Sequence, residues 1–271
     1  MNWLNRLKND MFSLVDTHSH LDEIEDLDGV LRRAEEAGIA SIVAVGSDFK
    51  SNRRVLEISG THNRCVIYAA LGFHPWNMSA SCTDTTLNFI ADNIHKVVAI
   101  GEVGLDFWLK GARKDPQEKA IQKEVFQRLL DVGREYEKPV IIHSRGAWEE
   151  CYRLVSEMQV KKAVFHWYSG PLEILEKILC SGYVISATPA AQYSEHHQMA
   201  ISRTPMENIL LETDSPVKYQ GKRSEPSDLM LVVEAVAKIK GITREEVAEI
   251  TAKNSEEFFN LKQSDAAESG C

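Results

Sequence analysis

The chain has 271 residues, of which 44% are hydrophobic and 26% are charged, and these fractions are typical of a globular protein with a buried core. Its formal net charge of −9 argues against a broad basic face that wraps duplex nucleic acid, but it does not exclude a small local site. The five cysteines are scattered and never in C-x-x-C spacing, which predicts reduced thiols in a cytoplasmic protein and no structural zinc.

Residues 1–12 carry apolar side chains at helical spacing, but Arg6, Lys8 and Asp10 interrupt them. This interruption is incompatible with the apolar region of a signal peptide, and no run in the chain approaches the ~18 apolar residues of a membrane span. We therefore expect residues 1–12 to form a short segment packed on the body, without membrane association.

The first predicted strand begins at Leu14 and Val15 and ends in Asp16-Thr17-His18-Ser19-His20. Strand side chains alternate between faces, so His18 and His20 point the same way, with their Cβ atoms roughly 6 to 7 Å apart. Two imidazoles in this arrangement can share one metal ion. Two histidines at this spacing are more often ordinary surface residues, so their interpretation depends on the rest of the chain.

A helix is predicted over residues 27–38, where five apolar residues lie on one face and Gly38 is a natural stop. Seven further apolar runs follow, at residues 39–45, 65–71, 97–100, 139–142, 163–165, 183–187 and 209–211. Helical patterns separate these runs, among them 52–59, 85–94 and 117–136, and two more helices are predicted at 226–240 and 244–259.

The eight runs consist mostly of unalternated Val, Ile and Leu, which indicates parallel strands buried on both faces. Eight strands separated by helices predict a single-domain TIM-like (β/α)8 barrel of the α/β class. We assign residues 13–262 to this domain and expect residues 263–271, a small polar tail, to be disordered.

Metal-ligating residue types recur at or just beyond the carboxyl ends of the predicted strands. They are His18, His20, His74, Glu102, His143, His166 and Asp214. Each alone is more often a hydrogen-bonded structural residue, but barrel closure brings all strand ends around one mouth, where the active sites of such barrels lie. The joint pattern therefore predicts one site. The other histidines, His62, His95, His196 and His197, fall in predicted loops or helices and receive no role.

Four of these imidazoles, with the two carboxylates and no thiolate, suit two divalent ions, of which Zn²⁺, Mn²⁺, Fe²⁺ and Mg²⁺ remain open. A carboxylate can bridge two metals, whereas an imidazole bridges only after losing a second proton. Glu102 is therefore the predicted bridge.

The strand-end motifs resemble those of the TatD-type metal-dependent deoxyribonucleases of the amidohydrolase superfamily. The matching segments span almost the whole chain. They are Asp16-Thr17-His18-Ser19-His20-Leu21, Gly72-Phe73-His74-Pro75, Ile100-Gly101-Glu102-Val103-Gly104-Leu105-Asp106, His143-Ser144-Arg145, Phe165-His166 and Glu212-Thr213-Asp214-Ser215-Pro216.

The resemblance implies a TIM-like barrel whose metal ligands come from these segments. It places His18, His20 and Asp214 on one metal, His143 and His166 on the other, and Glu102 between them. It also implies that His74 lies near the substrate phosphate and that Arg145 assists there.

Basic residues also cluster after two of the predicted strands. Lys110, Arg113 and Lys114 follow the fourth strand, and Lys218, Lys222 and Arg223 follow the eighth. Such clusters are most often solvated surface charge, but around a mouth they would attract a phosphate backbone.

These observations predict a metal-dependent hydrolase that cleaves DNA phosphodiester bonds, as an exonuclease on single-stranded or exposed ends, with Asp214 accepting a proton from the attacking water. DNA is the expected partner, and no obligate protein partner is implied. One alternative is another amidohydrolase-superfamily enzyme acting on a small amide, lactone or phosphoester. Many of those carry a carboxylated lysine as the bridge, so Glu102 favours the nuclease. The second alternative, a catalytically silent binding barrel, is disfavoured because no predicted ligand is missing.

Overall fold

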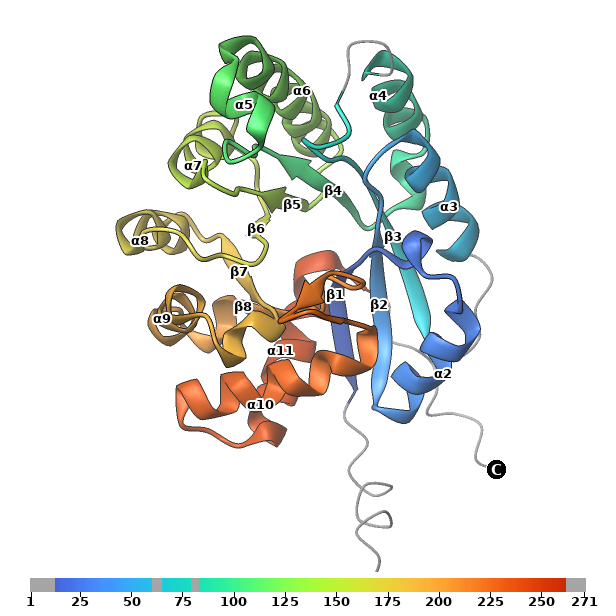
Figure 1. The fold of residues 1–271 in the computed structure, drawn as a ribbon, viewed down its shortest axis with the longest axis vertical. Coiled ribbons are helices and arrows are strands. Elements are labelled where there is room, and N and C mark those ends of the chain that lie inside the picture. The colour runs from blue at the N-terminus through green and yellow to red at the C-terminus, as the bar shows by residue number, and fades with distance from the viewer. Residues whose placement is uncertain (1–12, 60–64, 79–82, 262–271) are drawn as a thin grey trace, which may run out of the picture.

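The computed structural model describes residues 13–59, 65–78 and 83–261. In it, eight parallel strands follow one another in chain order around a nearly closed barrel (Figure 1). The strands are β1 (Leu14–Ser19), β2 (Ile39–Val45), β3 (Val66–Phe73), β4 (Ala99–Gly104), β5 (Val140–His143), β6 (Ala163–Phe165), β7 (Val184–Ala187) and β8 (Ile209–Leu211). The predicted TIM-like (β/α)8 barrel is confirmed.

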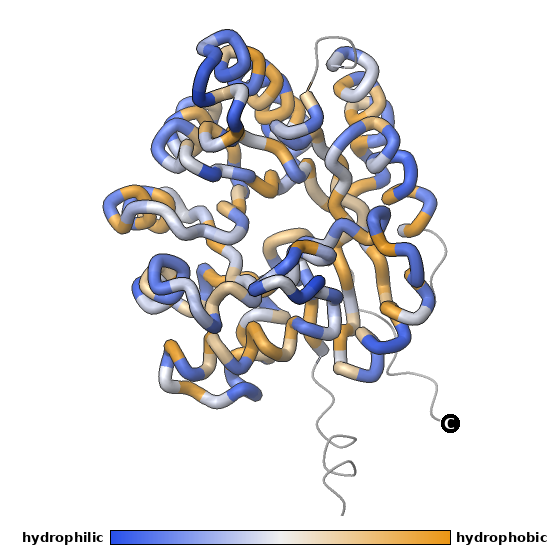
Figure 2. The backbone as a smooth tube through the Cα atoms, viewed as in Figure 1, coloured by the Kyte–Doolittle hydropathy of each residue, from blue (hydrophilic) through white to orange (hydrophobic). Residues whose placement is uncertain are grey.

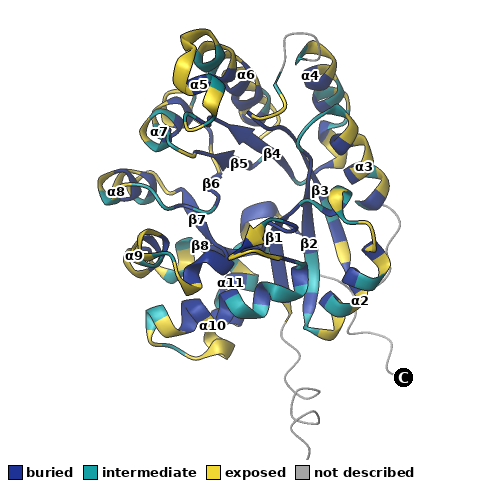
Figure 3. Cartoon of the chain, viewed as in Figure 1, coloured by how far each residue is buried: buried dark blue, intermediate teal, exposed yellow. Residues whose placement is uncertain are grey.

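Helices surround the strands on the outside of the barrel (Figure 1). They are α2 (Leu27–Glu36), α3 (Phe49–Ser59), α4 (Thr83–Asp92), α5 (Lys110–Lys114), α6 (Pro116–Glu135), α7 (Trp148–Glu157), α8 (Leu172–Cys180), α9 (Glu195–Arg203), α10 (Leu229–Lys240) and α11 (Arg244–Phe259). Short 3-10 helices lie at Leu21–Glu23, Ile94–Lys96, Pro189–Gln192, Met206–Asn208 and Pro226–Asp228. Figure 2 shows hydrophobic and hydrophilic residues alternating along the outer helices, and Figure 3 shows their exposed outer faces.

The structure departs from the sequence prediction in several local elements. Helix α3 begins at Phe49, three residues earlier than predicted, because the Asp48 carboxylate accepts a hydrogen bond from the Ser51 N–H at 2.8 Å. The first residues of the predicted helix 226–240 form a separate 3-10 turn.

Two short elements were not predicted. The hairpin of β9 (Lys218–Tyr219) and β10 (Lys222–Arg223) turns at Gln220 and Gly221, whose φ angles of 50° and 85° suit a tight two-residue turn. Helix α5 has five residues, too few to show a helical period.

The barrel interior is filled by one apolar cluster to which every strand contributes. Its strand members are Val15, Val43, Val45, Ala70, Ala99, Ile141, Val164, Val184 and Leu210. Phe258, Phe259 and Leu261, at and after the end of α11, belong to the same cluster. Because several of these strand residues lie at the start of their strands, the apolar filling occupies the amino-terminal end of the barrel. The carboxyl-terminal end is left to polar residues.

The barrel closes between β1 and β8 through the residues that follow β8. The Asp214 N–H donates to the His18 carbonyl at 2.9 Å, and the His20 N–H donates to the Ser215 carbonyl at 2.7 Å. The buried Asp16 carboxylate accepts the Thr213 N–H at 3.0 Å and its hydroxyl at 2.6 Å. This seam brings residues almost two hundred positions apart into contact, and it sets Asp214 beside the two histidines of β1.

Among the described residues, no helix is both long and apolar enough to cross a membrane. The predicted N-terminal segment at residues 1–12 and the predicted disordered tail at 263–271 lie outside the described residues.

Candidate metal centre

A pocket of about 860 Å³ opens at the carboxyl-terminal ends of the strands. It is lined by six of the seven strand-end residues singled out in the sequence, namely His20, His74, Glu102, His143, His166 and Asp214. The seventh, His18, is fully buried and lies directly against Glu102 and Asp214. The structure therefore brings all seven residues together in one site.

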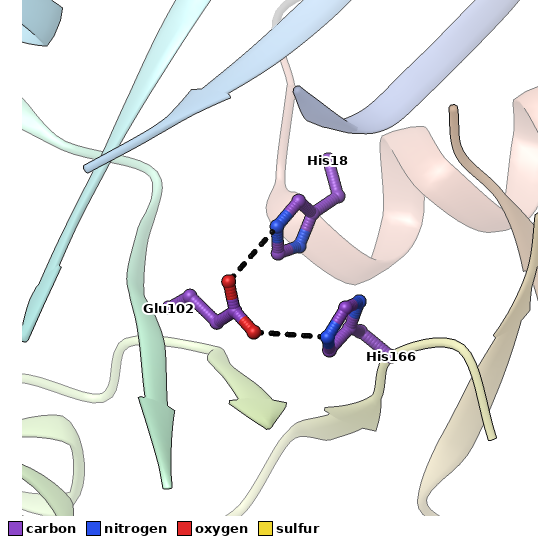
Figure 4. A group of neighbouring side chains, drawn as sticks. All are labelled: His18, Glu102 and His166. Carbon is purple, nitrogen blue, oxygen red and sulfur yellow. Dashed lines mark ion pairs between the residues drawn. The ribbon is translucent and has the colours of Figure 1, made fainter. Parts of the chain in front are cut away.

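Glu102, inside β4, lies at the centre of this site, and its two carboxylate oxygens face different histidines. Oε2 lies 3.3 Å from His18 Nε2 and 3.4 Å from His20 Nε2. Oε1 faces His143 Nδ1 at 2.7 Å, His166 Nε2 at 2.9 Å and His74 Nε2 at 3.4 Å. Figure 4 shows the carboxylate between His18 and His166. Burial alone raises the pKa of Glu102, but the surrounding histidines outweigh burial and hold it well below its usual value.

Glycine at position 72 lets β3 approach the backbone that carries Glu102. A Cβ atom at Gly72 would lie 2.3 Å from the Glu102 nitrogen and 2.4 Å from its carbonyl oxygen. Any side chain there would displace β4, so the glycine sets the position of the central carboxylate.

His18, His20 and Asp214 converge on one point beside Glu102. The two Nε2 atoms are 3.3 Å apart, and Asp214 Oδ1 lies 3.5 Å from the first and 3.6 Å from the second. Asp214 has a φ of +48°, a left-handed conformation that Asp tolerates better than most residues. Burial raises the pKa of Asp214. Burial lowers the pKa of His20, but hydrogen bonding and attraction to Glu102 outweigh this and raise it to about 9.

Three of the histidines are oriented by a hydrogen bond on the ring nitrogen that faces away from the site centre. His20 Nδ1 lies 3.0 Å from the Val45 carbonyl, His166 Nδ1 lies 3.2 Å from Glu212, and His143 Nε2 lies 3.2 Å from Asp106. Each outer nitrogen therefore donates its hydrogen to an oxygen atom, and the inner nitrogen offers a lone pair to a metal ion when the ring is neutral. Metal-binding histidines are held in this way.

His74 is oriented in the opposite sense. Its Nδ1 accepts the Trp76 N–H at 3.1 Å, so the proton lies on Nε2, which points at Glu102 Oε1. Burial lowers the pKa of His74 to about 4, with further repulsion from His143 and His20. In this neutral ring the inner nitrogen, Nε2, carries hydrogen and can donate it to an oxygen atom. His74 also lies close enough to Glu102 and His143 for the three residues to form one of the groups that could hold a metal ion.

Asp106 and Glu212 were not recognised from the sequence as site residues, although both lie in quoted motifs. The buried Asp106 carboxylate accepts hydrogen bonds from Arg145, Trp76 and His143, and these groups hold its pKa below its usual value although burial raises it. Strand alternation already sends Glu212 to the same face as Asp214, which is the one signal that pointed to it.

The structure places some of the predicted basic residues in the pocket lining and others outside it. Lys218 and Arg223 line the pocket together with Arg145, whose guanidinium is held by Asp106 at 2.8 Å. Lys222 instead lies 3.5 Å from Asp228. The three basic residues of α5 are absent from the described lining.

The donor set fits divalent metal ions. Imidazole nitrogens and carboxylate oxygens converge in three groups, each with its ligand atoms within 4.8 Å of one another. In addition, the His18 Nδ1 atom is buried without a hydrogen-bond partner. Nitrogen and oxygen atoms that approach one another to about 3.3 Å need a proton or a metal cation between them, and neutral imidazole with carboxylate suits Zn²⁺, Mn²⁺ or Fe²⁺.

Comparison with known proteins places the chain among similar sequences and structures. Residues 15–260 match the family model described as TatD related DNase. The chain is 32% identical to an uncharacterized metal-dependent hydrolase of Methanocaldococcus jannaschii, over 92% of this chain and 97% of that protein. It is also 32% identical to human deoxyribonuclease TATDN3, over 91% and 94% of the two chains. The crystal structure of a TatD homologue from Escherichia coli superposes with a TM-score of 0.83 at 26% identity, covering 93% of this chain and 100% of that one.

Proposed function

The chain belongs to the TatD-related DNase family of metal-dependent hydrolases, and from that premise we propose that it hydrolyses phosphodiester bonds of DNA, as an exonuclease on single-stranded or exposed ends. One observation carries the proposal. The two oxygens of Glu102 face two separate sets of imidazole nitrogens at the mouth of the pocket. A carboxylate shared in this way suits a pair of metal ions acting on a phosphodiester.

In this proposal the ligands divide as the family resemblance implies. His18, His20 and Asp214 would hold one ion, His143 and His166 the other, and Glu102 both. When bound, the two ions supply electrostatic stabilisation of the phosphate oxygens and acidify the attacking water. The ions are Zn²⁺, Mn²⁺, Fe²⁺ or Mg²⁺.

His74 and Arg145 would bind the phosphate. His74 offers an N–H into the pocket, since its other ring nitrogen is occupied by the Trp76 N–H. Arg145 is fixed by Asp106, while 42% of its side chain is exposed at the pocket wall. A guanidinium with part of its donors already anchored presents the others in a defined direction. Lys218 and Arg223 would hold further phosphates of the strand.

Asp214 would accept the proton of the attacking water. Its carboxylate lines the pocket, and its Oδ1 lies 3.5 Å or more from the nearest histidine nitrogens. A carboxylate positioned next to the attacking water is a suitable general base, and burial strengthens its basicity.

The test incubates the metal-loaded protein with oligonucleotides labelled at either end, single-stranded or duplex, with each candidate metal. The proposal expects a ladder of products that are shortened from one end by one nucleotide at a time. The ladder should form faster on single strands than on duplexes. The His20→Ala variant controls for contaminating nucleases. The proposal is wrong if neither strand is cleaved with any metal while a panel of amides, lactones or small phosphoesters is hydrolysed.

A further inference from the structure

Tryptophans gather at the mouth of the pocket, and two of them are exposed. The chain has five tryptophans, and four of them line this pocket: Trp76, Trp108, Trp148 and Trp167. Trp76 and Trp108 are 56% and 51% exposed, more than any other large hydrophobic side chain of the described residues. Burial in the core therefore does not explain their position. Clustered exposed aromatics around a concave site mark a binding surface.

The Asp106 carboxylate holds the Trp76 indole directly and the Trp108 residue through its backbone. The Trp76 Nε1–H donates to Oδ2 at 2.6 Å, and the Trp108 backbone N–H donates to Oδ1 at 3.0 Å. The Trp108 ring also packs on Gly146, where a Cβ atom would lie 2.3 Å from the indole Cδ1. Because the rings are fixed before a ligand arrives, little conformational entropy is lost when a flat group binds to them.

The aromatic surface adjoins the groups that would bind the phosphate. The Trp76 ring centre lies 4.8 Å from that of His74, and the Arg145 guanidinium lies 5.1 Å from the Trp76 ring centre. Flat rings beside a cation match one repeating unit of a nucleic acid, in which a planar base is joined to an anionic phosphate. Proteins that bind single strands combine the same two features.

This inference rests on the proposed function and specifies its substrate further. We infer that Trp76 and Trp108 form a stacking site for the unpaired base of the nucleotide next to the cleaved phosphate. Inside a duplex both faces of each base are covered by neighbouring base pairs, and the bases of a terminal pair remain paired, whereas a single-stranded or frayed end presents an unpaired base with a free face. Stacking is tolerant of base identity, so the site selects for strandedness and not for sequence.

The experiment compares two single-stranded substrates of equal length, an oligothymidylate and the same backbone with abasic residues near the labelled end. The metal-loaded parent should show a higher kcat/KM on the oligothymidylate, by roughly 10-fold or more if one base stacks on an indole. In the Trp108→Leu variant this ratio should approach one, chiefly through KM. The Trp108→Phe variant, which keeps a flat ring, should retain most of the ratio. General damage to the site would lower both rates together and leave the ratio unchanged.

The matched control is Tyr136→Leu, which removes an exposed aromatic outside the described pocket lining and should keep the parent's ratio. A parent that cleaves both strands equally, or an unchanged ratio in Trp108→Leu, overturns the stacking site while leaving the nuclease intact. If the loaded parent cleaves neither strand, the proposed function fails. The same two strands then test the stacking site by equilibrium binding, and equal affinity for both would overturn it.

Discussion

Histidines are buried in two regions of the barrel, and their surroundings shift the pKa in opposite directions. His166, at the mouth, has a carboxylate at each ring nitrogen, Glu102 at 2.9 Å and Glu212 at 3.2 Å. His197, on α9, is equally enclosed but meets only neutral groups, with the Tyr168 carbonyl at 2.8 Å from Nδ1 and the Thr188 N–H at 3.1 Å from Nε2.

The pKa of each histidine follows from these partners. Burial lowers the pKa of both, but at His166 the attraction of Glu102 and Glu212 outweighs burial, and the pKa lies well above its usual value. At His197 burial outweighs the carbonyl contact and the attraction to Glu212, and the pKa falls to about 4. Burial alone therefore does not identify a candidate ligand. The charge that faces the ring does, since a site that stabilises a proton on imidazole also stabilises a metal cation beside it.

Replacing Glu102 with Gln is expected to have the largest effect, because it removes the charge that faces both sets of histidines without changing the shape of the side chain. Metal content should fall at both predicted positions, and hydrolysis of single-stranded DNA should fall to the level of metal-free protein. Elemental analysis and rate measurement on the same preparation check this. Glu150→Gln, on α7, is the control and should retain its metal. Full metal content in Glu102→Gln would contradict the central role of this carboxylate.

The Asp214→Asn variant tests whether Asp214 accepts a proton or only shapes the turn. Asn tolerates the left-handed backbone at this position and keeps one oxygen, so the variant should fold. Loss of a general base lowers kcat by typically 10²- to 10⁴-fold. The measurement is kcat on DNA at a metal concentration that restores full occupancy. Activity within a few-fold of the parent would remove Asp214 from proton transfer.

Glu212→Gln tests the charge behind His166 without touching the ring itself. Partners that orient a metal-binding histidine typically contribute 10- to 100-fold in metal affinity or activity, and we expect a loss in this range. Titration of the metal-free variant with Zn²⁺ or Mn²⁺ measures the affinity. An unchanged affinity would mean that His166 does not depend on Glu212, and the contrast with His197 would then lose its basis.

His197→Gln should leave metal content unchanged and change the pH dependence of stability. Since the folded state lowers the pKa of His197 to about 4, the unfolded chain binds the proton first as the pH falls. The parent should therefore lose stability between about pH 6.5 and pH 4, by about 3 kcal/mol in total from this group. Above pH 7 the group contributes no pH dependence.

Urea unfolding of parent and variant at several pH values isolates this contribution as their difference. His95→Gln, which replaces an exposed histidine, controls for the substitution, and it should lose stability on acidification as the parent does. A difference between parent and His197→Gln that does not change with pH would show that His197 is not held neutral.

The outcome for individual histidines shows how far the sequence could be taken. His18, His20, His74, His143 and His166 were grouped correctly because each follows an apolar run, and parallel strands of a barrel end at the same rim. His197 received no role, but its complete burial was not foreseen. A histidine in a helix shows no local sign of the neighbours that will cover it.

The sequence by itself determined the order of the strands and which polar residues follow them, because hydrophobic runs and strand periodicity are local properties of the chain. Only the tertiary structure decided which groups face the ring nitrogens of these histidines. That depends on contacts such as His143 with Asp106 and His166 with Glu212, between residues tens of positions apart. The seam that sets Asp214 beside His18, and the gathering of tryptophans around Asp106, likewise arise only when the barrel closes. Such contacts depend on three-dimensional packing, so no local pattern predicts them.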